Sequence, residues 1–75
     1  MQLQSLVTAW NALSMTEKMA AFTRYCGLVD EGRGNEAPHC IILQNIWQYG
    51  WPAAAVLVVD GDGFLRTAAN MALAA

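Results

Sequence analysis

Charge is scarce in this chain of 75 residues. Only 13% of the residues are charged, four of them are basic, and the net charge is −2, whereas about 25% of the residues in a typical globular domain are charged. A surface that binds nucleic acid needs clustered lysines and arginines to neutralise phosphates. We therefore expect no direct contact with DNA or RNA.

Long apolar segments are also missing. The first ten residues lack the basic and apolar regions of a signal peptide. The longest uncharged stretch, residues 41–59, does not have the pattern of a membrane span. It is interrupted by Gln44, Asn45, Gln48, Gly50 and Pro52. We expect a cytoplasmic protein without membrane contact, and in the cytoplasm thiols are normally reduced.

Cysteine and histidine are too few for a strong metal or catalytic motif. Cys26, His39 and Cys40 are the whole set. Because structural zinc takes four ligands, a carboxylate such as Asp30 or Glu36 would have to complete a site. A Cys–His nucleophile pair and a disulfide contributing about 3 kcal/mol are further alternatives. We favour two cysteines packed on apolar helix faces, with no metal, no cofactor and no catalytic residue.

Apolar residues, in contrast, are plentiful. They make up 56% of the sequence, and a domain this small buries only about 60% of its unfolded surface. Part of the apolar material should therefore lie on the surface as a patch, which usually marks a protein interface. Small domains often gain stability from a partner subunit, so we expect a homodimer.

The first half of the chain predicts two helices. In residues 2–13, leucine, valine and tryptophan recur at helical spacing. Ser14 and Glu17 have the spacing of a capping box, which predicts the start of a second helix. This helix should cover residues 15–28, with Gly27 able to end it early. Its expected apolar stripe consists of Met15, Met19, Phe22, Cys26 and Val29.

A loop and a third helix should follow. Residues 30–38 are rich in turn formers. Pro38 suits the first turn of a helix over residues 37–49, and Gly50 is placed to end it. Its expected apolar side carries Ile42, Ile46 and Tyr49, with Cys40, Leu43 and Trp47 beside them.

The last third predicts a β-hairpin. Residues 56–59 and 64–67 are two apolar runs on either side of "DGDG". Residues 68–75 fit either a longer strand or a short helix. The expected fold is thus a single α+β domain, residues 1–75, with three short helices followed by a C-terminal antiparallel β-hairpin. Because an isolated hairpin is weak, we expect dimerisation to complete the sheet.

Two glycine-rich stretches have alternative functions to weigh. "GRG" is similar to loops that hold phosphate before a helix, but it lacks the lysine of a P-loop and has acidic neighbours. "DGDG" has two carboxylates, yet a calcium loop needs further oxygen ligands that are missing here. We interpret the first stretch as a polar connector and the second as a turn.

Partner-binding residues are expected among the aromatic and acidic side chains. "WQYGW" is the strongest binding segment because tryptophan and tyrosine are common interface hot spots. Trp51 is its expected exposed member, while Trp47 and Trp10 fit a core. The acidic loops should join in one negative patch if they meet in space. The candidate partner-binding residues are Asp30, Glu31, Glu36, Trp51, Asp60 and Asp62.

In its size, its lack of catalytic motifs and its acidic loops "VDEGRGNE" and "VDGDG", the chain resembles the small phage proteins that act against host machinery, and anti-CRISPR proteins in particular. The resemblance implies a non-enzymatic inhibitor that sterically blocks a CRISPR effector complex or its access to DNA. The acids would then meet basic residues that otherwise hold nucleic acid. Two alternatives are a small homodimeric adaptor or regulatory subunit of a bacterial system, and a Cys/His redox or metal protein.

Overall fold

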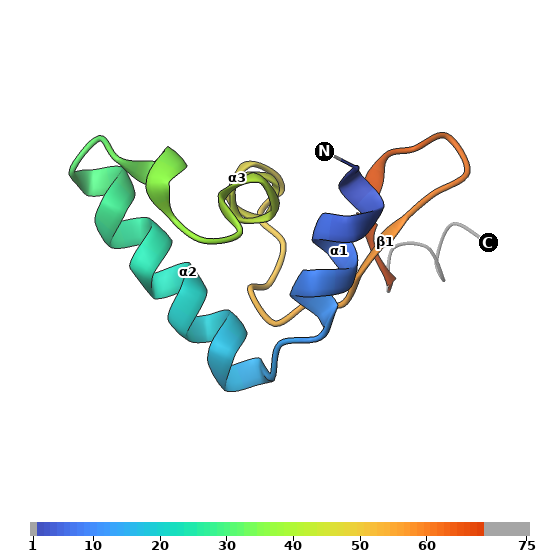
Figure 1. The fold of residues 1–75 in the computed structure, drawn as a ribbon, viewed down its shortest axis with the longest axis horizontal. Coiled ribbons are helices and arrows are strands. Elements are labelled where there is room, and N and C mark those ends of the chain that lie inside the picture. The colour runs from blue at the N-terminus through green and yellow to red at the C-terminus, as the bar shows by residue number, and fades with distance from the viewer. Residues whose placement is uncertain (1, 69–75) are drawn as a thin grey trace.

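The computed structural model describes residues 2–68 and has the predicted α+β architecture. In chain order, its elements are α1 (Leu3–Asn11), α2 (Met15–Asp30), the short 3-10 helix η1 (Gly34–Glu36), α3 (Cys40–Tyr49), β1 (Leu57–Val59) and β2 (Leu65–Thr67). Helices α1 and α2 diverge from a sharp corner, α3 lies between them, and the hairpin lies beside α1 (Figure 1). The prediction for the tail mostly concerns residues 69–75, which lie outside the described residues.

The corner between α1 and α2 is formed by the predicted capping box. The backbone amide of Glu17 donates to the Ser14 hydroxyl at 3.1 Å, and the Ser14 amide donates to the Glu17 carboxylate at 2.9 Å. These bonds satisfy two donors that the start of a helix otherwise leaves unpaired. The first two helices are therefore separate elements, as predicted.

The buried side of α2 differs from the predicted stripe. Lys18 and Tyr25 are buried, whereas Met15 and Met19 are 69% and 48% exposed. Helical spacing shows which residues share a face, but the neighbours α3 and η1 cover the side that carries Tyr25. Gly27 lies on the exposed side and does not end the helix, which continues to Asp30.

Helix α3 starts three residues later than predicted. His39 has a left-handed backbone (φ 59°) and Ala37 is extended, so neither residue can belong to a continuous helix. Pro38 therefore precedes the helix and does not lie in its first turn. The predicted end is confirmed, because Gly50 is left-handed at φ 68°.

The core surrounds Trp10, which is fully buried as predicted. Its indole N–H donates to the Ala55 carbonyl at 3.3 Å. The Lys18 ammonium donates to the same oxygen at 3.4 Å and lies 5.8 Å from the centre of the Trp10 ring. The apolar members of the core are Val7, Trp10, Tyr25, Ala37, Ile42, Leu43, Ile46 and Leu57.

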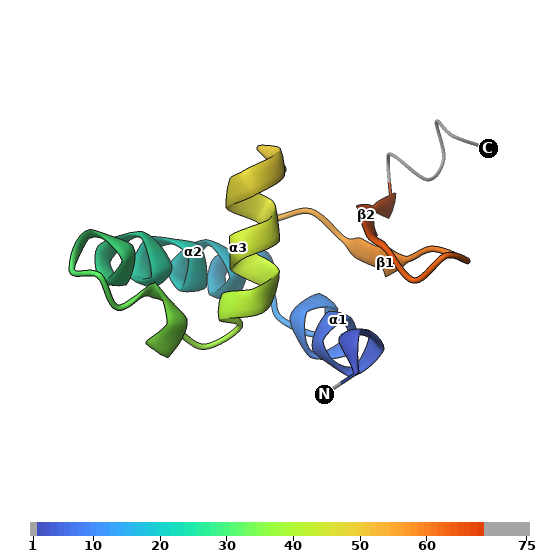
Figure 2. The same cartoon turned by 90° about the horizontal axis from the view of Figure 1, so that it is seen from above.

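The predicted hairpin is confirmed, with strands that pair Leu57 with Thr67 and Val59 with Leu65. Asn11 attaches it to α1. The Asn11 amide nitrogen donates to the Leu57 carbonyl at 2.7 Å, and its amide oxygen accepts from the Leu57 N–H at 3.0 Å. Asn11 thus supplies two hydrogen bonds of the kind that a neighbouring strand would make with β1. Figure 2 shows α1 lying next to β1.

Candidate protein-binding surface

The two acidic loops do not meet, so the prediction of one joint negative patch is wrong for a single chain. The loop after α2 lies at one end of the molecule and the hairpin turn lies at the other (Figure 1), along a longest dimension of 39 Å. The two ends are separated because α3 and α1 pack between them. The acids therefore form two separate groups.

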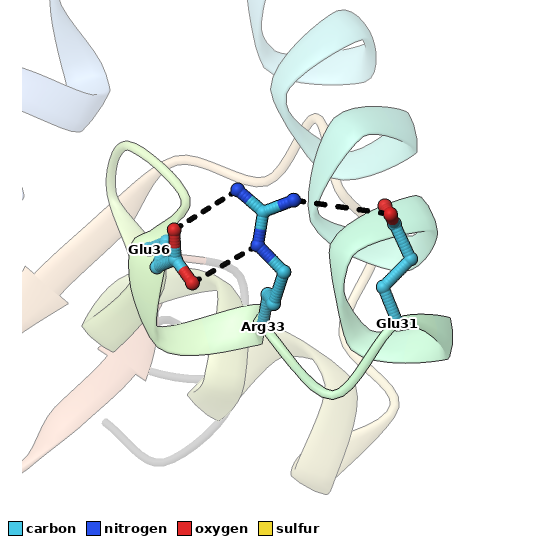
Figure 3. Close-up of polar contacts among 3 residues, drawn as sticks. All are labelled: Glu31, Arg33 and Glu36. Carbon is cyan, nitrogen blue, oxygen red and sulfur yellow. Dashed lines mark hydrogen bonds and ion pairs between the residues drawn. The ribbon is translucent and has the colours of Figure 1, made fainter.

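The first group surrounds Arg33. Its guanidinium makes two bonds of 3.0 Å to Glu36 and an ion pair of 3.8 Å with Glu31, as Figure 3 shows. The Glu36 carboxylate raises the pKa of Arg33 above its usual value. These side chains are more than half exposed, so the pairs stabilise the fold only weakly. Asp30 makes no ion pair within residues 2–68.

The second group is built into the hairpin turn. The Asp60 carboxylate accepts the N–H groups of Asp62 and Phe64, both at 2.9 Å, and pairs with the guanidinium of Arg66. Only 8% of the Asp60 side chain is exposed. The Asp60 carboxylate therefore holds the turn together, and Asp62 is the exposed acid at the tip.

We expect the hairpin to weaken in acid through Asp60. The Arg66 guanidinium, helped by the N–H of Phe64, lowers the pKa of Asp60 below its usual value. A carboxyl whose folded pKa is depressed stabilises the fold above its unfolded pKa, about 3.9, and this stabilisation is lost as the pH falls through the lower folded value. Carboxyl-carbon NMR should give an Asp60 midpoint below that unfolded value.

The matched control for this titration is Asp60→Asn, which retains an oxygen to accept the two backbone N–H groups but cannot pair ionically with Arg66. It should reduce the dependence of hairpin stability on pH. An Asp60 midpoint at or above 3.9 would contradict the prediction.

A hollow lies beside this turn, between the end of α3 and the hairpin. It has a volume of about 380 Å³, and we call it the aromatic hollow. Its lining residues are Asn45, Tyr49, Trp51, Phe64, Leu65 and Arg66. The rings of Tyr49 and Trp51 stack with centres 5.1 Å apart. Tyr49 and Phe64 are 59% and 64% exposed, so the hollow presents aromatic surface to a partner.

The exposure of the aromatic residues differs from the prediction. Trp51 is partly buried against the core, whereas Trp47, expected in the core, is 53% exposed. The chain reverses at Gly50, and the Trp51 N–H donates to the Ile46 carbonyl at 3.1 Å. This reversal returns the Trp51 ring to the end of α3. The predicted exposure of Trp51 and burial of Trp47 are therefore both wrong.

A second apolar surface runs along α2, which we call the α2 face. It consists of Met15, Met19, Phe22 and Cys26 of α2 together with Trp47 of α3. The ring centres of Phe22 and Trp47 are 6.2 Å apart, so α2 and α3 both contribute to this surface. The sequence analysis placed the four α2 residues on one apolar stripe by their helical spacing, but it gave no indication that Trp47 of α3 lies beside them.

The candidate metal and thiol residues are dispersed. Cys26 and Cys40 are free and partly buried, on α2 and at the start of α3. The His39 ring packs edge-on against the Trp10 ring, with the ring centres 5.7 Å apart. Within residues 2–68, no three His, Cys, Asp or Glu side chains gather in a way that fits a metal ion.

None of the helices in residues 2–68 has both the length and the apolar content that crossing a membrane requires. In comparisons with known proteins, the chain matches no family model, no curated protein and no solved structure.

Proposed function

We propose that this protein is not an enzyme and acts by binding another protein through the aromatic hollow. The observation that carries the proposal is the gathering of Tyr49, Trp51 and Phe64 around one concave surface. Tyrosine and tryptophan are over-represented among the residues that dominate binding energy. A hollow with several exposed aromatic side chains suits an apolar anchor of a partner protein better than it suits a small charged substrate.

Polar groups around the hollow would orient such a partner. The Nε atom of Arg66 pairs with Asp60, so its terminal nitrogens can donate to a partner carbonyl or carboxylate. The Asn45 amide nitrogen donates to the Ile41 carbonyl, which leaves the amide oxygen as an acceptor. Asp62 on the adjacent turn is exposed and suits a partner's basic residue.

In its most specific form, we propose that the protein is a phage antidefence inhibitor of the anti-CRISPR kind. The two acidic loops support this proposal because the loop after α2 and the hairpin turn both lie on the upper side of the molecule in Figure 1. An effector complex holds nucleic acid in a long basic channel, and an elongated body with acids at both ends fits such a channel. The protein would then block the complex sterically, by occupying the space that DNA needs.

A small adaptor or regulatory subunit of a bacterial system is the second candidate. It is favoured by the presence of two distinct apolar surfaces, the aromatic hollow and the α2 face. An adaptor needs one surface for each of two partners, whereas a simple inhibitor needs only one.

The test measures inhibition of purified CRISPR effector complexes of several types, read as loss of target-DNA binding in gel shifts. The chain should inhibit at least one type. Tyr49→Ala and Phe64→Ala should each weaken inhibition about tenfold or more, as expected for hot-spot residues. Both side chains are largely exposed, so the variants should fold. Val56→Ala, which removes an exposed apolar side chain outside the hollow, should have no effect.

Three outcomes separate the functions. If no complex is inhibited but the hollow variants abolish the capture of another bacterial protein, the adaptor function is supported and the antidefence function is rejected. Inhibition that disappears in Cys26→Ser or Cys40→Ser would instead support thiol chemistry. Inhibition that is unchanged in both hollow variants would overturn the assignment of the binding surface.

A further inference from the structure

Strand β2 has an outer edge that pairs with no other strand among residues 2–68. The sheet has the order β1–β2, so β1 is the only neighbour of β2 there. In an antiparallel pair of strands, residue pairs that exchange hydrogen bonds alternate with pairs that do not. The Asp60 N–H donates to the Phe64 carbonyl at 2.9 Å, so the next pair, Val59 with Leu65, is of the second kind. The Leu65 N–H and C=O therefore point away from β1, toward the outer edge.

The other edge of the sheet follows the same alternation and is already occupied. Leu57 on β1 forms a pair of the second kind with Thr67, and its N–H and C=O both bond to the Asn11 side chain. Outside the ladder with β1, in contrast, the backbone of Leu65 has no hydrogen bond to any residue from 2 to 68. Because the backbone groups of an exposed edge can pair with a further strand, β2 offers a site for one.

The aromatic hollow lies along this edge. Its lining includes three consecutive residues of the hairpin, Phe64, Leu65 and Arg66, but no residue of β1. Successive side chains of a strand point to opposite faces of a sheet, so a hollow on one face would not contact all three residues. A hollow that contacts all three and does not reach β1 adjoins the strand along its outer edge. The outward N–H and C=O of Leu65 therefore face the hollow.

We propose that the aromatic hollow binds an extended segment of the partner protein, which adds to β2 as a third strand. This inference rests on the proposed function and specifies the form that the partner takes at the same site. The backbone of the segment makes two hydrogen bonds to Leu65, one to its N–H and one to its C=O, as in other domains that bind peptides by extending a sheet. The third strand also stabilises the hairpin, since two strands alone are marginal in water.

The two faces of β2 determine which side chains this segment needs. Leu65 packs toward the core, so the residue beside it points to the same side, toward the rings of Tyr49 and Trp51, and should be apolar. The next residue lies beside Arg66 on the opposite face. It should be acidic, because Asp60 occupies only the Nε atom of the Arg66 guanidinium and the terminal nitrogens can pair with a carboxylate. The expected segment thus has an apolar residue next to an acidic one.

A second copy of β2 is less suited to this edge. Arg66 is the middle residue of β2, so a two-fold pairing of two β2 strands about their centres places Arg66 opposite Arg66 of the other copy. Like charges directly opposite each other are destabilising in a sheet. A carboxylate from a different protein has the opposite charge, which favours a segment of another protein at this edge.

Hydrogen exchange of single amides tests the edge in the protein alone. The Leu65 amide should exchange fast, whereas the Arg66 amide faces β1 and should be slowed by its ladder bond to Val58. A Leu65 amide as slow as that of Arg66 would show that the edge is already covered. Protection of Leu65 that increases with protein concentration would identify a second copy as the occupant. Either result would overturn the proposal.

The binding probe is the capped peptide Thr-Val-Glu-Leu-Glu-Val-Thr, which places a glutamate beside Arg66 in either strand direction. NMR titration should show saturable binding, and the Leu65 amide should become protected as peptide is added. The control peptide Thr-Val-Gln-Leu-Gln-Val-Thr has the same shape without the charge. It should bind roughly 2- to 5-fold more weakly, the effect of one cross-strand charge pair. No binding, equal binding of both peptides, or binding that leaves the Leu65 amide fast contradicts the proposal.

A backbone variant separates this inference from the proposed function. Chemical synthesis with an N-methyl amide at Leu65 removes the outward N–H but keeps the side chain and the ladder with β1. Because this N–H makes no bond to residues 2–68, the variant should keep its helical circular dichroism and a protected Leu57 amide. It should bind the glutamate peptide about tenfold more weakly or worse, since a backbone carbonyl of the peptide loses its donor.

The same variant should lose inhibition in the assay with effector complexes. Full inhibition by the N-methyl variant, combined with loss of inhibition in Tyr49→Ala, would reject strand addition and leave the hollow as the binding surface. If no effector complex is inhibited, the antidefence function fails by itself, and the peptide titration decides whether β2 accepts a third strand.

Discussion

Replacement of Trp10 by alanine is expected to lower the free energy of unfolding by about 3–5 kcal/mol. A domain of this length has a total stability of roughly 4–11 kcal/mol, so the variant should be largely unfolded or melt at a much lower temperature. The reason is that Trp10 is fully buried and contacts Ala55, on the chain that leads to β1, and His39, just before α3. Urea denaturation followed by far-ultraviolet circular dichroism measures the change.

The loss involves more than apolar area. Removal of the indole also removes the N–H bond to the Ala55 carbonyl and the ring over which the Lys18 ammonium lies. Lys18 is itself buried, and a buried cation that loses contacts is costly. Trp47→Ala is the matched control. Because Trp47 is half exposed, we expect a cost of about 1 kcal/mol, and equal costs at the two positions would show that Trp10 is not the centre of the core.

Asn11→Ala should have the second-largest effect, about 2–3 kcal/mol. The Asn11 side chain forms a donor and an acceptor bond to the backbone of Leu57, and Leu57 is buried. Without Asn11, both backbone groups of Leu57 lose their partners and the hairpin loses its polar attachment to α1. Hydrogen exchange should show that the Leu57 amide becomes unprotected while amides in α3 remain slow.

Asn45→Ala is the control for this experiment. The Asn45 amide also bonds to a backbone carbonyl, but it does so one turn back on its own helix and in an exposed position. Its removal should change stability by no more than about 0.5 kcal/mol. A Leu57 amide that stays protected in Asn11→Ala would show that apolar packing alone holds the hairpin.

The candidate site was only partly predictable. The segment with Trp47, Tyr49 and Trp51 was identified because its aromatic residues lie close together in the sequence. Trp51 packs inward because the chain reverses at Gly50. Tyr49 and Phe64 form a rim because the hairpin lies near the end of α3. These are contacts between distant segments, and no local pattern encodes them.

The sequence by itself determined the order and type of the three α-helices and the two strands, but not the short 3-10 helix η1. Ser14 and Glu17 begin α2, Gly50 ends α3, and the turn around Asp60 joins β1 and β2. These features could be predicted because caps and turns depend on hydrogen bonds and backbone angles within a few residues. Tertiary structure alone decided which side of α2 is covered. Helical spacing in α2 is compatible with a buried side that carries Met15 and Met19, and equally with one that carries Lys18 and Tyr25. The side with Lys18 and Tyr25 is the buried one because α3 and η1 pack against it.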